Sequence, residues 1–137
     1  MKLIALLLGL STLVNAQSLL KDAVSFRLGA SVNPRMLVEN EAYRNIASNE
    51  FTSLTAENHM KMMLIHPAAD RFDFTKGDEI VAFAAKTGKR MHGHTLVWHQ
   101  QTPAWVFQNG EGQFLDQEDL IRRMEDHIAT VVGRYKG

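Results

Sequence analysis

Hydrophobic and β-forming residues recur along the chain in two patterns, one typical of strands and the other of amphipathic helices. Short stretches rich in β-forming residues predict strands at residues 25–32, 51–55 and 89–98. Apolar residues at three- and four-residue spacings predict helices at residues 40–49, 78–86 and 116–135. Thr87-Gly88 provides a glycine cap after the second helix, and Asp116 is a good N-cap for the third.

These elements alternate strictly between strand and helix, in the order β-α-β-α-β-α. Such alternation indicates parallel strands joined by helical crossovers. Two architectures fit, a small open sheet or the opening portion of a βα barrel, and periodicity alone does not choose between them. No Pro/Ser-rich linker, low-complexity tract or charge block divides residues 17–137, so we expect one structural unit there.

Composition removes several classes of protein. The chain has 137 residues, 15 basic and 15 acidic side chains, and no cysteine. The lack of cysteine excludes a disulfide framework, a cysteine-based zinc site and a thiol nucleophile. Balanced charge without a basic run argues against a nucleic-acid binder. A complete eight-stranded βα barrel needs roughly 200–250 residues, so this length excludes a closed one.

The first 16 residues have the features of a secretory signal peptide. Lys2 supplies a positive charge, the stretch from Leu3 to Val14 is mostly apolar, and Val14-Asn15-Ala16 offers small residues for cleavage. The apolar stretch is too short to span a bilayer, which takes about 20 residues. We therefore expect cleavage after Ala16 and a secreted or periplasmic protein with no membrane contact after cleavage.

Three polar residues follow the second predicted strand, where functional side chains collect in parallel α/β folds. Glu57 offers a carboxylate, Asn58 an amide that donates and accepts, and Lys61 an ammonium. Such a trio suits a ligand dense in hydroxyl groups. The alternative is a helix start in which Glu57 and Lys61 form a solvated pair four residues apart.

A second candidate site lies in the third predicted strand. Strand alternation would place His92, His94, Leu96 and Trp98 on one face. Imidazole beside a flat apolar ring suits sugar rings and also nucleobases, and Pro103, Ala104 and Trp105 add an aromatic loop after it. The alternative is that these histidine and tryptophan side chains only pack in the core.

The same histidines also allow a metal-dependent hydrolase, because His92-x-His94 puts two imidazoles on one strand face. The candidates that could converge with them are His59, His66 and His99, although strand alternation puts His99 on the opposite face. Distinctive acidic ligands are missing nearby, so we expect no metal site and no cofactor. Glycosidase chemistry needs paired carboxylates, and the sequence offers Glu57 no obvious second one.

The motifs together resemble glycoside hydrolase family 10, the endo-1,4-β-xylanases. The resemblance rests on Thr55-Ala56-Glu57-Asn58 with Met60-Lys61, on His66-Pro67 with Phe72-Asp73-Phe74, and on the stretches Phe26 to Asn33, Ile80 to Ala84, Gly93 to His99, Gln101 to Trp105 and Gly133 to Gly137. It covers essentially all of residues 17–137. Met62 departs from the pattern, since the family usually has Trp there.

This resemblance implies a retaining xylanase on a (β/α)8 barrel, of which residues 17–137 are the N-terminal part with the first three βα units, not closed. Glu57, Asn58 and Lys61 would bind xylose units on the non-reducing side of the cleaved bond. His94, Trp98 and Gln101 would line the sugar next to it. The partner implied is xylan or a xylo-oligosaccharide, and the oligomeric state is left open.

The family's two catalytic glutamates end its fourth and seventh strands, beyond Gly137. We therefore expect a truncated chain that does not cleave xylan by itself. The alternative is a non-catalytic xylan-binding fragment, or one that pairs with a separate complementary chain. Unpaired edges on the first and third strands also lead us to expect poor folding or self-association, which sedimentation and melting experiments would detect.

Overall fold

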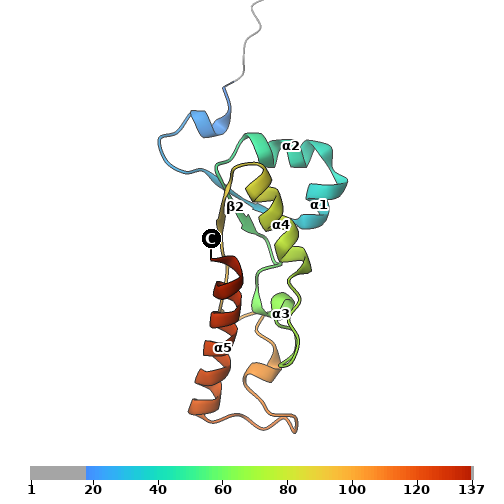
Figure 1. Ribbon diagram of the computed structural model, residues 1–137, viewed down its shortest axis with the longest axis vertical. Coiled ribbons are helices and arrows are strands. Elements are labelled where there is room, and N and C mark those ends of the chain that lie inside the picture. The colour runs from blue at the N-terminus through green and yellow to red at the C-terminus, as the bar shows by residue number, and fades with distance from the viewer. Residues whose placement is uncertain (1–17, 137) are drawn as a thin grey trace, which may run out of the picture.

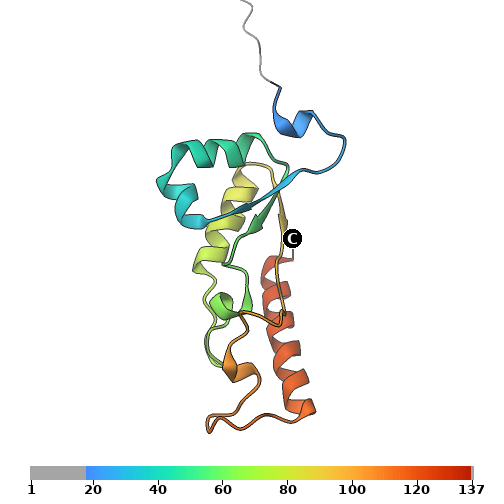
Figure 2. The same cartoon turned by 180° about the vertical axis from the view of Figure 1, so that it is seen from behind.

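The computed structural model describes residues 18–136 and contains the predicted alternation of strands and helices. Figures 1 and 2 show the chain from opposite sides. The elements are η1 (Leu20–Asp22), β1 (Gly29–Val32), α1 (Pro34–Glu39), α2 (Glu41–Asn49), β2 (Ser53–Ala56), α3 (Met62–Ile65), α4 (Thr75–Lys86), β3 (Arg90–His92), η2 (Ala104–Val106) and α5 (Gln117–Tyr135).

The three strands form one parallel sheet in the order β1-β2-β3. Gly29 of β1 pairs with Ser53 of β2, which in turn pairs with Arg90 of β3. The sheet is open, because within residues 18–136 β1 and β3 each have one strand neighbour. This open sheet fits the partial, unclosed barrel that the family resemblance implies, and poor folding or self-association through the unpaired edges stays a prediction.

Side-chain caps explain where α1, α2 and α5 begin. Oδ1 of Asn33 accepts a hydrogen bond from the Arg35 backbone N–H at 3.0 Å and Pro34 follows it, so α1 starts with a cap and a proline at its first position. Asn40 caps α2 in the same way, and Asp116 caps α5 as predicted. The helix predicted at residues 40–49 is confirmed as α2, whereas α1 and α3 were not predicted.

The third strand is shorter than predicted. β3 ends at His92, which pairs with Thr55, one residue before β2 ends at Ala56. Residues after Gly93 lie past the end of β2, and the prediction of a strand over residues 89–98 is wrong after His92. The shared face inferred from strand alternation for His92, His94, Leu96 and Trp98 therefore does not hold.

The first strand and the helix α4 also begin or end a few residues away from their predicted bounds. The first strand begins at Gly29 rather than at residue 25, and Phe26 before it is 66% exposed. α4 begins at Thr75 and ends before Gly88, whose φ of 67° is the left-handed conformation that glycine adopts at helix ends.

The core lies between the sheet and the helices that cover it. Leu54 of β2 is fully buried, and Ile80 and Ala84 of α4 are buried in the same cluster. Val131 of α5 joins this cluster from the other end of the chain. In Figures 1 and 2, α5 rises from the tip of the long loop after β3 back to the level of the strands. This packing fixes the carboxyl ends of β1 and β2, next to which the candidate site lies.

The predicted signal peptide, residues 1–16, lies outside the described residues. Between residues 18 and 136, no helix combines the length and the apolar character needed to cross a bilayer.

Candidate functional site

The six predicted site residues follow the carboxyl ends of β2 and β3, and we call Glu57, Asn58, Lys61, His94, Trp98 and Gln101 the ligand edge. Glu57 comes directly after β2, and its backbone N–H donates to the Val32 carbonyl at the end of β1 at 3.0 Å. The turn that follows is closed by a hydrogen bond from the Lys61 N–H to the Asn58 carbonyl at 2.9 Å. The sheet therefore fixes the main chain beneath these side chains.

Lys61 is held by Asn58 rather than by Glu57. Its Nζ donates to Oδ1 of Asn58 at 2.8 Å, while Oε2 of Glu57 accepts from Nδ2 of Asn33 at 3.0 Å. Lys61 is also the N-cap residue of α3 and has extended backbone. The alternative of a solvated Glu57–Lys61 pair on one helix is therefore wrong, because a strand-end turn and not a helix joins the two residues.

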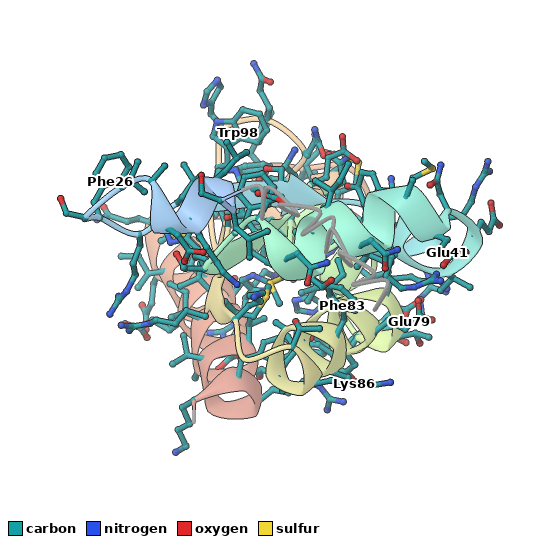
Figure 3. The ribbon with its side chains drawn as sticks, turned by 90° about the horizontal axis from the view of Figure 1, so that it is seen from above. Phe26, Glu41, Glu79, Phe83, Lys86 and Trp98 are labelled. Carbon is teal, nitrogen blue, oxygen red and sulfur yellow. The ribbon has the colours of Figure 1, made fainter. Side chains whose placement is uncertain are left out.

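The aromatic part of the ligand edge comes from the loop after β3. Nζ of Lys61 lies 5.2 Å from the centre of the Trp98 ring, and the His94 ring centre lies 6.4 Å from that of Trp98. Figure 3 shows Trp98 on the side of the molecule opposite Phe83 and Lys86 of α4. The structure therefore brings Lys61, His94 and Trp98 together on the face that α4 leaves open.

Gln101 is placed by its backbone. Its carbonyl accepts from the Met63 N–H of α3 at 3.0 Å, and its φ of 51° is unusual for a residue other than glycine. The hydroxyl of Thr102 donates to the Trp98 carbonyl and closes the same loop. The loop that carries Trp98 is thus attached to the element that carries Lys61.

The ligand edge combines an exposed carboxylate, an amide, an ammonium and an aromatic ring that is partly accessible. Hydroxyl groups of a sugar can donate to the carboxylate and accept from the ammonium, while a sugar's C–H face can stack on the indole. An apolar groove of about 310 Å³ lies beside this edge between β3 and α5, and His94 is part of its lining with Met91, Leu96 and Val131.

A second cluster of rings was not predicted as a unit, and we call His66, Phe72, Trp105 and His127 the histidine junction. His66 and His127 are 3% and 1% exposed, and their Nδ1 atoms lie 3.2 Å apart. His66 stacks on Phe72 with ring centres 3.7 Å apart. The sequence did contain a signal, because His127 falls on the apolar stripe of α5 beside Ile128 and Val131.

The hydrogen-bond partners favour one arrangement of protons on the two imidazoles. Nε2 of His66 lies 3.4 Å from the Ala69 carbonyl, which can only accept, so this nitrogen carries a proton. Nδ1 of neutral His66 then accepts from Nδ1–H of His127. Burial lowers the pKa of both histidines, and the neighbouring His66 lowers that of His127 further. The Leu96 carbonyl, which approaches His127 without completing a hydrogen bond to Nε2, has the opposite effect.

Trp105 belongs to the histidine junction and not to the ligand edge. Its indole Nε1–H donates to the His66 carbonyl at 3.0 Å. Arg123 of α5 donates to the Trp105 carbonyl and lies over its ring, with Cζ 5.7 Å from the ring centre. The aromatic loop predicted at residues 103–105 therefore ties α5 to α3.

The metal-site alternative receives no support from the geometry. His66 is occupied by His127, and within residues 18–136 no three side chains of His, Asp or Glu gather as metal ligands. His92, His94 and His99 are exposed on the segment from β3 into the loop that follows.

Three parallel strands joined by helical crossovers, with polar and aromatic side chains after their carboxyl ends, fit the opening units of a βα barrel. The family model of glycosyl hydrolase family 10 matches residues 16–137. The chain therefore belongs to glycosyl hydrolase family 10.

Relatives and solved structures agree with this membership. The chain is 45% identical to endo-1,4-beta-xylanase B of Paenibacillus barcinonensis over 114 residues, which cover 83% of this chain and 33% of that protein. It matches the crystal structure of endo-1,4-beta-xylanase from Caldicellulosiruptor owensensis with a TM-score of 0.76 and 43% identity, over 81% of this chain and 33% of the other. A mutant structure in complex with xylotriose matches with a TM-score of 0.76, 40% identity and the same coverage. The chain thus spans about a third of the length of these proteins.

Proposed function

We propose that this chain supplies the first three βα units of a retaining endo-1,4-β-xylanase and that its part is to bind the xylan backbone. The observation that carries the proposal is the position of Lys61, whose ammonium is held by Asn58 beside the Trp98 ring at the carboxyl ends of the strands. A charged donor next to an aromatic face matches a sugar with a polar rim and an apolar face. Family membership supports xylan as that sugar polymer.

In this proposal the ligand edge divides into two parts. Glu57, Asn58 and Lys61 bind xylose units on the non-reducing side of the cleaved bond. His94, Trp98 and Gln101 line the sugar next to that bond. The reaction needs an acid/base and a nucleophilic carboxylate about 5–5.5 Å apart, and both would come from later strands of the barrel.

We also propose that residues 1–16 direct export and are removed after Ala16, which makes the protein secreted or periplasmic. The charge at Lys2, the apolar stretch and the small residues before the cleavage point support this. N-terminal sequencing of the exported protein should begin at Gln17, and an intact Met1 start would contradict the proposal.

Binding can be followed on the two tryptophans, which serve as probe and internal control. The ¹H–¹⁵N spectrum of the full chain should show the Trp98 indole shifting on addition of xylohexaose. The Trp105 indole, which donates to the His66 carbonyl, should stay in place. Equal shifts of both indoles, or none with millimolar xylohexaose, would count against the ligand edge as the binding site. The same titration with cellohexaose measures whether the site prefers xylose units to glucose units.

Substitution of the ammonium gives the quantitative test. Lys61→Met keeps the length of the side chain but removes its charge, and charge-assisted hydrogen bonds contribute about 1.5–3 kcal/mol, so affinity for xylohexaose should fall at least about tenfold. Lys76→Met is the matched control, because Lys76 pairs with Glu79 on α4. A reducing-end assay should find no xylan cleavage by the chain alone; cleavage above background would refute the placement of the catalytic carboxylates on later strands.

A further inference from the structure

Asn33 uses both ends of its side-chain amide, and the two hydrogen bonds fix which way the amide points. Its Oδ1 accepts from the Arg35 backbone N–H at 3.0 Å, which can only donate. Its Nδ2 therefore faces Oε2 of Glu57, which accepts at 3.0 Å. The residue that caps α1 thus also donates a hydrogen bond to the Glu57 carboxylate.

The main chain of Asn33 is held as firmly as its side chain. The hydroxyl of Tyr43, on α2, accepts from the Asn33 N–H at 3.1 Å and donates to the Ser31 carbonyl at 3.4 Å. Tyr43 is itself held where α2 starts, because its N–H donates to Oδ1 of Asn40 at 2.9 Å. The end of β1 is therefore pinned from α2, so Asn33 has a fixed frame from which to hold Glu57.

Glu57 depends on this frame because its own surroundings are open. Its backbone is bound to the Val32 carbonyl, but its side chain is exposed, and the neighbouring ammonium of Lys61 is directed to Asn58 instead. In the described part of the chain, Asn33 is the residue whose side chain binds the Glu57 carboxylate. An exposed glutamate without such a partner would exchange among rotamers.

We propose that Asn33 is a positioning residue for the Glu57 carboxylate, and that Tyr43 supports it from α2. Nδ2 of Asn33 occupies one acceptor site on Oε2 and leaves the other carboxylate lone pairs directed to the open side, where a sugar hydroxyl can donate. The role in sugar binding rests on the proposed function, whereas the restraint on the Glu57 rotamer does not. Asn33 itself need not touch the sugar.

One substitution separates this role from helix capping. Asn33→Asp keeps an oxygen for the Arg35 N–H, since Asp caps helices as well as Asn does. It replaces the donor facing Glu57 by a second carboxylate, which repels the first. Asn40→Asp is the matched control, because it makes the same change at the N-cap of α2.

The first measurement needs no ligand. Three-bond couplings across the Cα–Cβ bond of Glu57 should report a single rotamer in the unsubstituted chain and in the Asn40→Asp control. They should report rotamer averaging in Asn33→Asp but not in the Asn40→Asp control, and partial averaging in Tyr43→Phe. Averaged couplings in the unsubstituted chain, or couplings unchanged by Asn33→Asp, would overturn the proposal whether or not the chain binds sugar.

The second measurement tests whether the restraint matters for binding. Asn33→Asp should weaken xylohexaose binding at least fivefold, while in a Glu57→Ala background it should change binding less than twofold. A purely structural role would weaken binding equally in both backgrounds and would overturn the proposed action through Glu57. Absence of binding by the unsubstituted chain would refute the proposed function and the part of this inference that concerns sugar, leaving the rotamer result to decide the rest.

Discussion

Trp98 and Trp105 lie on the same loop after β3, yet they belong to two regions with opposite properties. In the ligand edge, the Trp98 ring faces the ammonium of Lys61 and the exposed His94. In the histidine junction, Trp105 donates to the His66 carbonyl and accepts from Arg123 of α5. One tryptophan is oriented toward a surface that a ligand can reach, and the other connects α3 to α5.

The difference lies in where the polar groups find their partners. The junction places two imidazoles in the interior and pairs them through their Nδ1 atoms, although Nε2 of His127 completes no hydrogen bond. At the ligand edge, the hydrogen bonds come from neighbours that orient the side chain, while much of its surface stays open. Substitutions should therefore separate the regions: changes in the junction should affect stability, and changes at the edge should affect binding.

The largest expected effect is on stability, from removal of the His127 ring. His127→Ala leaves a cavity, breaks the stacked contacts with His66, and leaves Nδ1 of His66 buried without its partner. Such losses reduce the free energy of unfolding by about 2–4 kcal/mol. Urea unfolding in dilute solution, followed by circular dichroism, measures this change.

His99→Ala is the matched control, since His99 is an exposed histidine that contacts the Trp98 ring. Surface substitutions of this kind change stability by less than about 0.5 kcal/mol. If both variants lost the same stability, the contrast between the two regions would be wrong.

Acid should also lower the free energy of unfolding through the histidine junction. The loss should be smaller than that caused by His127→Ala, because the rings remain in place. The pKa of His66 and of His127 is lowered by burial from an ordinary value of 6.5, so the unfolded chain binds protons more readily than the folded one. The stabilising contribution is therefore complete above pH 6.5 and is lost as the pH falls toward the folded-state values. Asp78, whose pKa is lowered from 3.8 chiefly by its hydrogen bond to Arg134, responds only at lower pH.

The pH dependence can be assigned to the junction with His127→Asn. Asparagine places an amide near the position of Nδ1 but does not titrate in this range. The decline in urea midpoint from pH 7 to pH 5 should be shallower in this variant than in the original chain. An equal decline would show that other groups cause it.

The alternation of elements could be predicted from the sequence because its determinants are local. The cap at Asp116 and the apolar stripe after it predicted α5 almost to the residue. The end of β3 could not be predicted in this way, since it depends on where the neighbouring β2 ends. The length of a strand depends on the strand it pairs with, so the residue pattern of one strand does not predict where it ends.

In the candidate site, too, local features could be predicted from the sequence and distant partners could not. That Glu57, Asn58 and Lys61 follow a strand end could be read from the chain. The partner of Glu57 could not, because Asn33 lies 24 positions away and its amide had a local role as a helix cap. The partner of His127 lies 61 positions away, so its position on the apolar stripe indicated burial but not pairing.

The smallest expected effects on stability come from substituting two helical glycines. These substitutions test how tightly α5 packs against α4. A Cβ at Gly77 of α4 would lie 2.7 Å from Oη of Tyr135, which donates to Asp78 at 3.0 Å, whereas a Cβ at Gly133 of α5 meets no atom within 4 Å. Gly77→Ala must displace the tyrosine, so we expect a loss of about 1 kcal/mol despite the better helix propensity of alanine. Gly133→Ala gains that propensity without a clash and should stabilise the chain by about 0.5 kcal/mol. If the two substitutions shift the urea midpoint in opposite directions, the tight packing lies on the side of α5 that faces α4. Shifts of the same sign would contradict this placement, because helix propensity alone would then account for both.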